Sequence, residues 1–225
     1  WVLYTQNIVC KYYADSILVH GDKRILPLIS DRTRQANSVQ IIKDIEPIVK
    51  YTGYVCDENQ PVHNQKDNNI YVSTGLNKDE AVTVFKKIAE NHKFIMPIAN
   101  KYNSMGGRRN KNIYLVEYVP ELRKKLTTCA AYITYGGYNA TVEILKGQIP
   151  SIVVPRQSGK KMEQFIRAFT FEPYDFYKVL TLQEFNNIKI VLDEILNGYK
   201  PKPFEFNLKG ASNTARFLAG MYNEL

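Results

Sequence analysis

The chain has 225 residues, of which 44% are hydrophobic and 23% charged, and its formal net charge is +8. That length and apolar content suffice for one large or two small globular domains with a buried core. No apolar run approaches the roughly 20 residues needed to cross a bilayer, which excludes a membrane-spanning helix. Three scattered cysteines exclude a disulfide framework or a metal knuckle and fit a reducing compartment.

The positive charge alone does not distinguish nucleic acid, a membrane surface and a phosphorylated substrate as partners. Lysine and arginine concentrate in short loops at 106–112, 123–125 and 159–161. They do not follow one helix with interleaved aromatic residues, as basic nucleic-acid interfaces often do. We therefore expect no nucleic-acid partner.

The first 55 residues predict the remnant of a separate amino-terminal domain. A strand-like segment at 16–28 has no earlier strand to pair with, so we expect a fragment of a longer protein. A helical pattern at 38–50 and the segment "YTGYV" (51–55) follow. Residues 56–69 then combine proline, aspartate and four asparagines with almost no apolar residue, which predicts an interdomain linker and a boundary near residue 60.

From residue 70 to 225, short β-branched runs alternate with amphipathic helical runs. This alternation predicts an α/β fold, a doubly wound and mainly parallel Rossmann-like sheet with its ligand crevice beyond the carboxyl ends of the strands. The strands are expected at 70–75, 94–99, 112–119, 130–135, 151–155 and 177–180, and the helices at 77–92, 120–126, 138–147, 160–171, 181–198 and 210–225.

The stretch "YITYGGYNATVEILKGQIPSIVVPRQSG" (132–159) ends an apolar strand on Gly136 and Gly137 and opens a helix directly on them. Such a helix presents free backbone N–H groups and the positive end of its dipole, so anions bind there. The two glycines remove side chains that would keep a phosphate from these amides. Glu143 lies in the second turn, and a carboxylate can accept hydrogen bonds from a ribose diol. The stretch predicts a phosphate-bearing ligand.

A second loop, "PRQSGKKMEQ" (155–164), leaves a neighbouring strand at the same edge and supplies Arg156, Glu163 and Gln164. Phosphate, ribose and a polyhydroxyl group could all be bound from these two loops. Taken singly, each signal also fits a tight turn with Glu143 facing solvent.

The combination "GGYNATVEILKGQIPSIVVPRQSGKKMEQFIRA" resembles the carboxyl-terminal domain of family-28-type (MurG-like) glycosyltransferases of the GT-B fold. The family pattern is a glycine, a threonine or serine, a glutamate, a small residue with proline, a Val-Pro pair, and a Glu-Gln pair before an alanine-containing helix. In this chain the pattern falls on Gly137, Thr141, Glu143, Pro150, Val154, Pro155, Glu163, Gln164 and Ala168.

The resemblance implies an inverting, metal-independent transferase that needs no cofactor and binds a UDP- or TDP-sugar in this domain. By position, Glu143 would bind the ribose hydroxyls, and Glu163 and Gln164 the sugar. The other implied binding residues are Gly75 on the first glycine-rich loop, Tyr118 and Val119 beside the base, Gly136, Gly137 and Tyr138 with backbone N–H groups toward the diphosphate, and Asn139, Thr141 and Arg156 in the same two loops. The first loop, "VSTGLNKD", has one glycine where relatives usually carry two or three.

In such enzymes the acceptor and the general base belong to the amino-terminal domain, and by this resemblance we expect most of that domain to be missing from this sequence. Asp15, His20 and Asp22 are the nearby candidates, and His20 at the end of an apolar strand is more typical of a structural histidine. We therefore assign no catalytic residue, and we expect the fragment alone to be inactive.

Two alternatives stay open. The chain could have another GT-B activity, as a nucleotide-sugar epimerase or hydrolase, or it could be a non-catalytic nucleotide-sugar-binding subunit of a two-part transferase. The expected partners are the donor, an unknown acceptor and the missing domain or subunit. The expected location is the cytoplasm in glycan or cell-envelope biosynthesis, where a basic surface would suit a lipid-linked acceptor at a membrane.

Overall fold

The computed structural model describes residues 14–23, 46–73, 78–89, 92–97, 112–156, 162–205 and 207–223. The chain forms two compact units, one of Trp1–Glu58 with Glu205–Leu225 and the other of Asn59–Phe204. The division differs from the predicted domains at the end of the chain. The backbone N–H of Tyr54 donates to the carbonyl of Asn207, and that of Gly210 to the carbonyl of Tyr54, which joins the last segment to the first unit.

The larger unit is built on a six-stranded sheet in the order β5-β4-β3-β6-β7-β8, with every pair parallel. The chain begins at the central strand β3, adds β4 and β5 on one side, and then returns to place β6, β7 and β8 on the other side. The topological switch point therefore lies between β3 and β6. This confirms the predicted Rossmann-like α/β fold. The strands are β3 (Asn69–Ser73), β4 (Lys93–Pro97), β5 (Ile113–Val116), β6 (Ala131–Thr134), β7 (Ser151–Val153) and β8 (Lys178–Val179).

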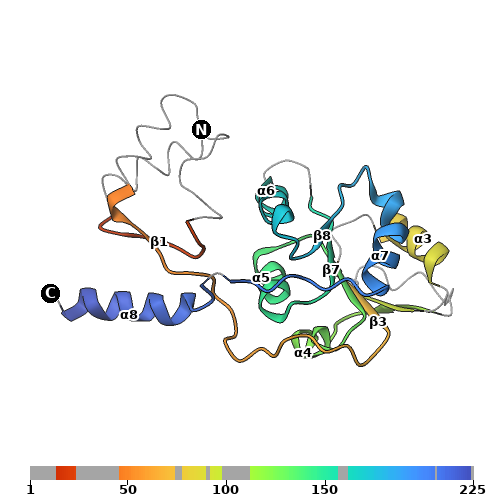
Figure 1. Cartoon of the computed structure of the whole chain (residues 1–225), viewed down its shortest axis with the longest axis horizontal. Helices are drawn as coiled ribbons and strands as arrows, with labels where there is room; N and C mark the ends of the chain where they lie inside the picture. The colour runs from red at the N-terminus through yellow and green to blue at the C-terminus, as the bar shows by residue number, and fades with distance from the viewer. Residues whose placement is uncertain are drawn as a thin grey trace. The chain divides into compact units, whose positions relative to one another are not determined.

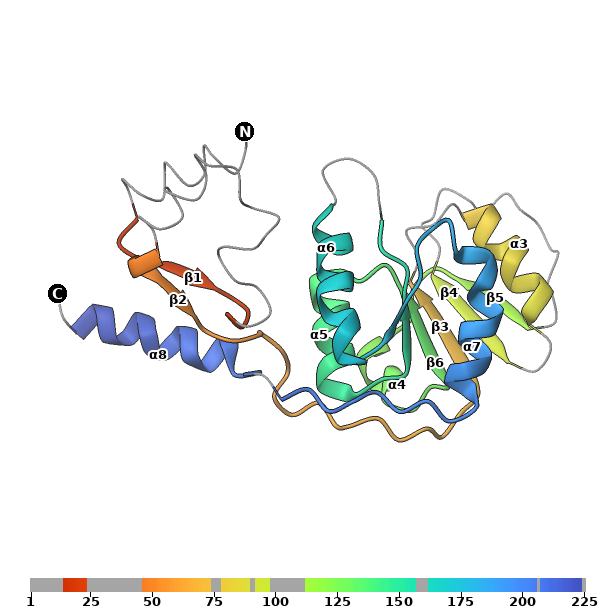
Figure 2. The same cartoon turned by 45° about the horizontal axis from the view of Figure 1, so that its top comes forward.

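Helices cover both faces of this sheet (Figure 2). Alternate residues such as Ile70 and Val72 point into an apolar core shared with Phe85 of α3 and with Ile188 and Leu192 of α7. The intervening residues point to the other face, which α5 and α6 cover. The helices of this unit are α3 (Lys78–Ile88), α4 (Leu122–Leu126), α5 (Tyr138–Gly147), α6 (Met162–Phe171) and α7 (Ile188–Leu196), with single 3-10 turns η5 (Glu172–Tyr174) and η6 (Phe185–Asn187).

The helix predicted at 181–198 begins later than expected. The backbone N–H of Thr181 donates to the Glu184 carboxylate at 3.0 Å, and the backbone N–H of Glu184 donates to the Thr181 hydroxyl at 3.2 Å. This reciprocal pair is the geometry of a capping box. It closes a turn of its own, so η6 and α7 start only after it.

The smaller unit contains the parallel pair β1 (Ile17–Val19) and β2 (Val49–Tyr51), which follows η2 (Glu46–Ile48). The predicted helix at 38–50 is therefore wrong at its end, because pairing with β1 takes Val49–Tyr51 into a sheet; residues 38–45 lie outside the described part.

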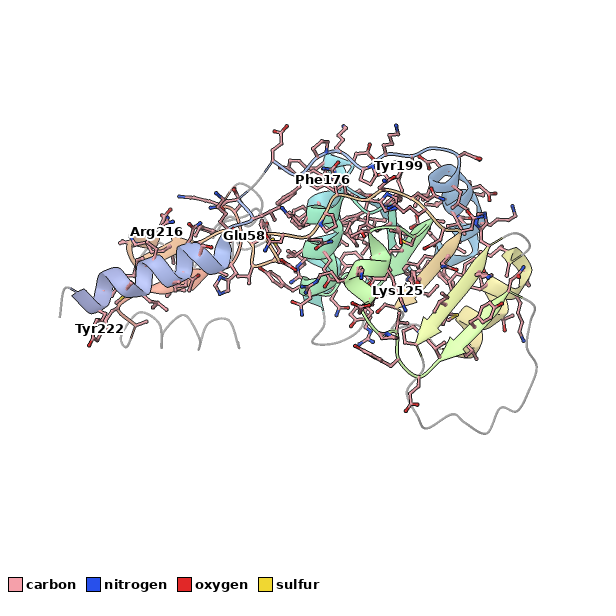
Figure 3. The ribbon with its side chains drawn as sticks, turned by 90° about the horizontal axis from the view of Figure 1, so that it is seen from below. Glu58, Lys125, Phe176, Tyr199, Arg216 and Tyr222 are labelled. Carbon is pink, nitrogen blue, oxygen red and sulfur yellow. The ribbon has the colours of Figure 1, made fainter. Side chains whose placement is uncertain are left out.

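Helix α8 (Gly210–Asn223) completes the smaller unit. The Asn213 amide donates to the carbonyl of Thr52 at 2.8 Å, and the Ser212 hydroxyl to the Glu58 carboxylate at 2.7 Å. Figure 3 shows Glu58 beside the start of α8. These bonds explain why α8 groups with the first unit although it ends the chain.

Residues 59–68, which composition assigns to a linker, run along the larger unit and hydrogen-bond to it (Figure 1). The backbone N–H of His63 donates to the carbonyl of Gly147, the last residue of α5, and that of Asn64 to the carbonyl of Thr127, the C-cap of α4. The Gln60 amide donates to the carbonyl of Glu143 at 3.1 Å. This strap, residues 59–68, therefore satisfies carbonyl groups at the ends of two helices.

Candidate functional site

The carboxyl edge of the sheet beside the switch point is formed by a tight connection between β6 and α5. Three residues follow Thr134 before the helix begins, and Gly136 has φ +72°. A Cβ atom on Gly136 would lie 2.7 Å from Cγ1 of Val153 in β7. The fold itself therefore requires a glycine at this position, both for the left-handed backbone and for the close approach to β7.

Helix α5 begins at Tyr138 with Gly137 as its N-cap and without a side-chain cap. Its first turn presents backbone N–H groups that have no acceptor within the helix, together with the positive end of the helix dipole. Thr141 lies one turn in and is 1% exposed, and its hydroxyl has no hydrogen-bond partner within the described ranges. The helix start is therefore both electropositive and equipped with an unsatisfied buried polar atom.

Two guanidinium groups flank this turn. Cζ of Arg156, just after β7, lies 4.7 Å from the ring centroid of Tyr135. Nη1 of Arg167, on α6, donates to the carbonyl of Gly136 at 3.1 Å, and its Cζ lies 5.6 Å from the ring centroid of Tyr138. Both cations are thus held beside the amide groups of α5, which strengthens the attraction for an anion.

Arg167 is a residue that the sequence analysis missed. It lies one turn after Gln164 on α6, so the two side chains project from the same face of that helix. The side-chain oxygen of Gln164 and Nε of Arg156 are both buried and lack a hydrogen-bond partner among the residues described. The i, i+3 spacing from the predicted Gln164 was the one signal that could have pointed to Arg167.

Glu143 in the second turn of α5 is held by an arginine from the basic run at 123–125. Nε of Arg123 on α4 donates to Oε1 of Glu143 at 3.1 Å. The Glu143 side chain is 18% exposed and that of Arg123 is 51% exposed. The carboxylate is therefore partly desolvated and oriented from one side.

The phenol of Tyr132 is buried on β6, one of the two strands at the switch point. Burial raises the pKa of the Tyr132 phenol, hydrogen bonds with the side chains of Thr134 and Ser73 oppose this rise, and the charge of Glu143 adds to it. Ser73 and Thr134 pair across β3 and β6. The raised pKa keeps this phenol neutral beside the ends of the two central strands.

The structure describes most, but not all, of the residues predicted for the site. Tyr118, beyond the carboxyl end of β5, is 73% exposed, whereas Val119 is buried. Asn139 is exposed on the first turn of α5. Glu163 belongs to α6, where the structure describes its backbone, and Gly75 falls outside the described residues.

The candidates for a catalytic base, Asp15, His20 and Asp22, belong to the smaller unit. Nδ1 of His20 lies 2.9 Å from the hydroxyl of Thr52. Across the described ranges, histidine, cysteine and carboxylate side chains form no group that could hold a metal ion.

A cavity of about 450 Å³ lies at the opposite edge of the sheet, beside Ala130 before β6 and Pro150 before β7. His63, Gln148 and Tyr199 also line it. It contains no residue of the α5 turn, so we do not place the predicted ligand there. The Rossmann arrangement binds its ligands at the carboxyl edge.

Comparison with known proteins identifies the family. The glycosyltransferase family 28 C-terminal domain matches residues 54–221. This chain belongs to glycosyltransferase family 28. A search of curated proteins by sequence finds no match.

Several solved glycosyltransferases share the fold of this family 28 chain. The glycotransferase of kitacinnamycin aligns with a TM-score of 0.54 at 15% identity, over 82% of this chain and 47% of that protein. MurG of Acinetobacter baumannii aligns with a TM-score of 0.53 at 11% identity, over 86% and 71% of the two chains. LpCGTa, solved in complex with UDP, gives 0.55 at 16% identity over 90% and 48%. This chain thus spans about half the length of the first and third of these proteins.

No helix in the described ranges is long and apolar enough to cross a membrane.

Proposed function

We propose that this chain is the donor-binding half of an inverting glycosyltransferase and that it binds a UDP- or TDP-sugar for transfer to an acceptor hydroxyl. The observation that carries the proposal is the start of α5 at the switch point, which has no side-chain cap and has Arg156 and Arg167 in contact with the residues that lead into it. An amide-lined, electropositive helix end suits a diphosphate, whose charge increases when the sugar leaves.

The predicted residues take complementary roles in this proposal. Backbone N–H groups of Gly137 and Tyr138 bind the diphosphate, and the hydroxyl of Thr141 supplies a further hydrogen bond. The N–H of Gly136 donates to the Thr134 hydroxyl at 3.4 Å, so it would have to exchange that long bond for one to the ligand. Glu143 accepts hydrogen bonds from the ribose, while the sugar lies toward α6. The remaining predicted contacts are Gly75, Tyr118, Val119, Asn139, Glu163 and Gln164.

The amino-terminal half, or a partner subunit, would supply the acceptor site and the general base. The chain alone would then bind the donor without transferring the sugar. Such a division places the stabilisation of the leaving diphosphate on this chain and the activation of the acceptor on the other half. We further propose that the complete enzyme works in the cytoplasm, at a membrane surface if its acceptor is lipid-linked.

The experiment that tests this proposal is thermal unfolding of the 225-residue chain with a panel of UDP-, TDP- and GDP-sugars. A ligand at a hundredfold excess over its dissociation constant adds about 2.7 kcal/mol of stability. For a protein of this size we expect a rise of roughly 5–10 °C in the unfolding temperature with one nucleotide class.

Glu143→Ala should abolish most of this rise, because the ribose loses its acceptor. Glu172→Ala removes an exposed carboxylate of the same unit, in the 3-10 turn after α6, and should leave the rise intact. If no nucleotide sugar shifts the unfolding temperature, or if both variants respond like the unmodified chain, the proposed donor site is wrong.

A further inference from the structure

Helix α4 is a short element whose backbone is anchored from several directions. Leu126 is fully buried, and the strap donates backbone N–H groups to Thr127 and Thr128 immediately after the helix. The Cys129 thiol donates to the carbonyl of Leu126 at 3.3 Å. A side chain that leaves α4 therefore starts from a fixed position.

Arg123 leaves α4 toward α5 and occupies one oxygen of the Glu143 carboxylate. The contact joins Arg123 Nε to Oε1 at 3.1 Å. Within the part of the chain that the structure describes, Oε2 of Glu143 accepts no hydrogen bond. An ionised carboxylate accepts through both oxygens, so the second one is left for another donor.

We propose that Arg123 is a positioning residue for nucleotide recognition. It fixes the rotamer of Glu143 through Oε1, so that Oε2 is directed to the ribose hydroxyls. The inference rests on the proposed function, since it assumes that Glu143 meets a ribose.

The physical reason is the cost of ordering a glutamate. A glutamate side chain without partners exchanges among several staggered rotamers and loses that freedom when it binds a ligand. Arg123 removes this cost in advance, because the free chain already holds the carboxylate in one orientation. Since the arginine is half exposed, the ion pair itself adds little to folding stability. Its effect should appear in ligand binding.

A simpler explanation is that Arg123 only attracts the negative diphosphate at a distance. Lys124 provides the matched control, because it is the next cation on α4 and is 80% exposed. Its Nζ lies 3.9 Å from Oε1 of Glu121, so its ion pair is with another carboxylate than that of Glu143. Lys124→Ala removes the same charge from the same helix and leaves the carboxylate held.

The decisive measurement compares nucleotides with and without ribose hydroxyls by titration calorimetry. The probes are uridine diphosphate against its 2′,3′-dideoxy form, and thymidine diphosphate against its 3′-deoxy form. For the nucleotide that binds, we expect the unmodified chain to prefer the hydroxylated form by roughly tenfold or more, because the acceptor is charged. Arg123→Ala should reduce this preference to about threefold or less, and Lys124→Ala should leave it unchanged. Glu143→Ala should remove it.

If neither diphosphate binds the unmodified chain, the proposed function fails and the inference fails with it. If a diphosphate binds and Arg123→Ala keeps the full preference for hydroxyl groups, the inference is overturned while the donor site stands. Should Arg123→Ala not fold, Arg123→Gln removes the charge with less loss of side-chain volume, and the same change in preference is required of it.

Discussion

Replacing Gly136 with alanine tests the architecture of the α5 turn directly. The alanine must adopt φ +72°, and its Cβ would lie 2.7 Å from Cγ1 of Val153. A left-handed backbone costs about 1–2 kcal/mol for a residue with a Cβ, and an extra atom in a packed core costs about 1–3 kcal/mol. We therefore expect Gly136→Ala to lower the free energy of unfolding by about 2–5 kcal/mol.

The two contributions separate in a second background. Val153→Ala removes the methyl group that the new Cβ would strike, so in that background Gly136→Ala should cost about 1–3 kcal/mol less. The assay is urea unfolding followed by far-UV circular dichroism on the four chains of this cycle. A cost of Gly136→Ala that is equal in both backgrounds, or below about 0.5 kcal/mol, would refute the account of this turn.

Two further predictions concern Arg167 beside the α5 turn and Cys129 before β6. Arg167→Met keeps most of the alkyl chain but removes the hydrogen bond to Gly136. We expect urea unfolding to show a free energy of unfolding lower by about 1–2 kcal/mol, and calorimetry to show weaker binding of the nucleoside diphosphate. If neither value changes, the role given to Arg167 is wrong. Burial, with a smaller contribution from the charge of Asp67, raises the pKa of the Cys129 thiol from 9.0 to about 12. The contribution of the neutral thiol to the free energy of unfolding is complete below pH 9.0 and declines as the pH rises toward 12, because the thiol of the unfolded chain loses its proton first. Cys129→Ala should therefore flatten the fall of the urea midpoint with rising pH. An equally steep fall in the variant would show that Cys129 is not its cause.

The local sequence pattern was sufficient to predict the bounds of an element where residues adjacent in the chain set them. The helix predicted at 138–147 has these bounds in the structure, because two glycines end an apolar strand and a periodic run follows at once. The reason given for Gly136 changes, however. Access for a phosphate is the reason that the sequence suggests, whereas contact with Val153 requires the glycine whether or not a ligand binds.

Tertiary contacts decided the features that the sequence did not reveal. Arg123 lies in a basic run and Arg167 on an amphipathic helix. In the sequence both look like solvated side chains, and their roles become visible only from their contacts with Glu143 and Gly136. Val49–Tyr51 pairs with a strand about thirty residues earlier, which overrides the helical periodicity around it.

The strap of residues 59–68 has a practical consequence for dividing this protein into pieces. A piece that starts at residue 69 would contain every strand of the large sheet but would leave the carbonyls of Glu143, Gly147 and Thr127 without their donors from Gln60, His63 and Asn64. Each lost bond costs about 1 kcal/mol, and the loss falls on the two helices that carry Arg123 and Glu143. A minimal donor-binding piece should therefore begin at residue 59, in a segment whose polar composition resembles a dispensable spacer.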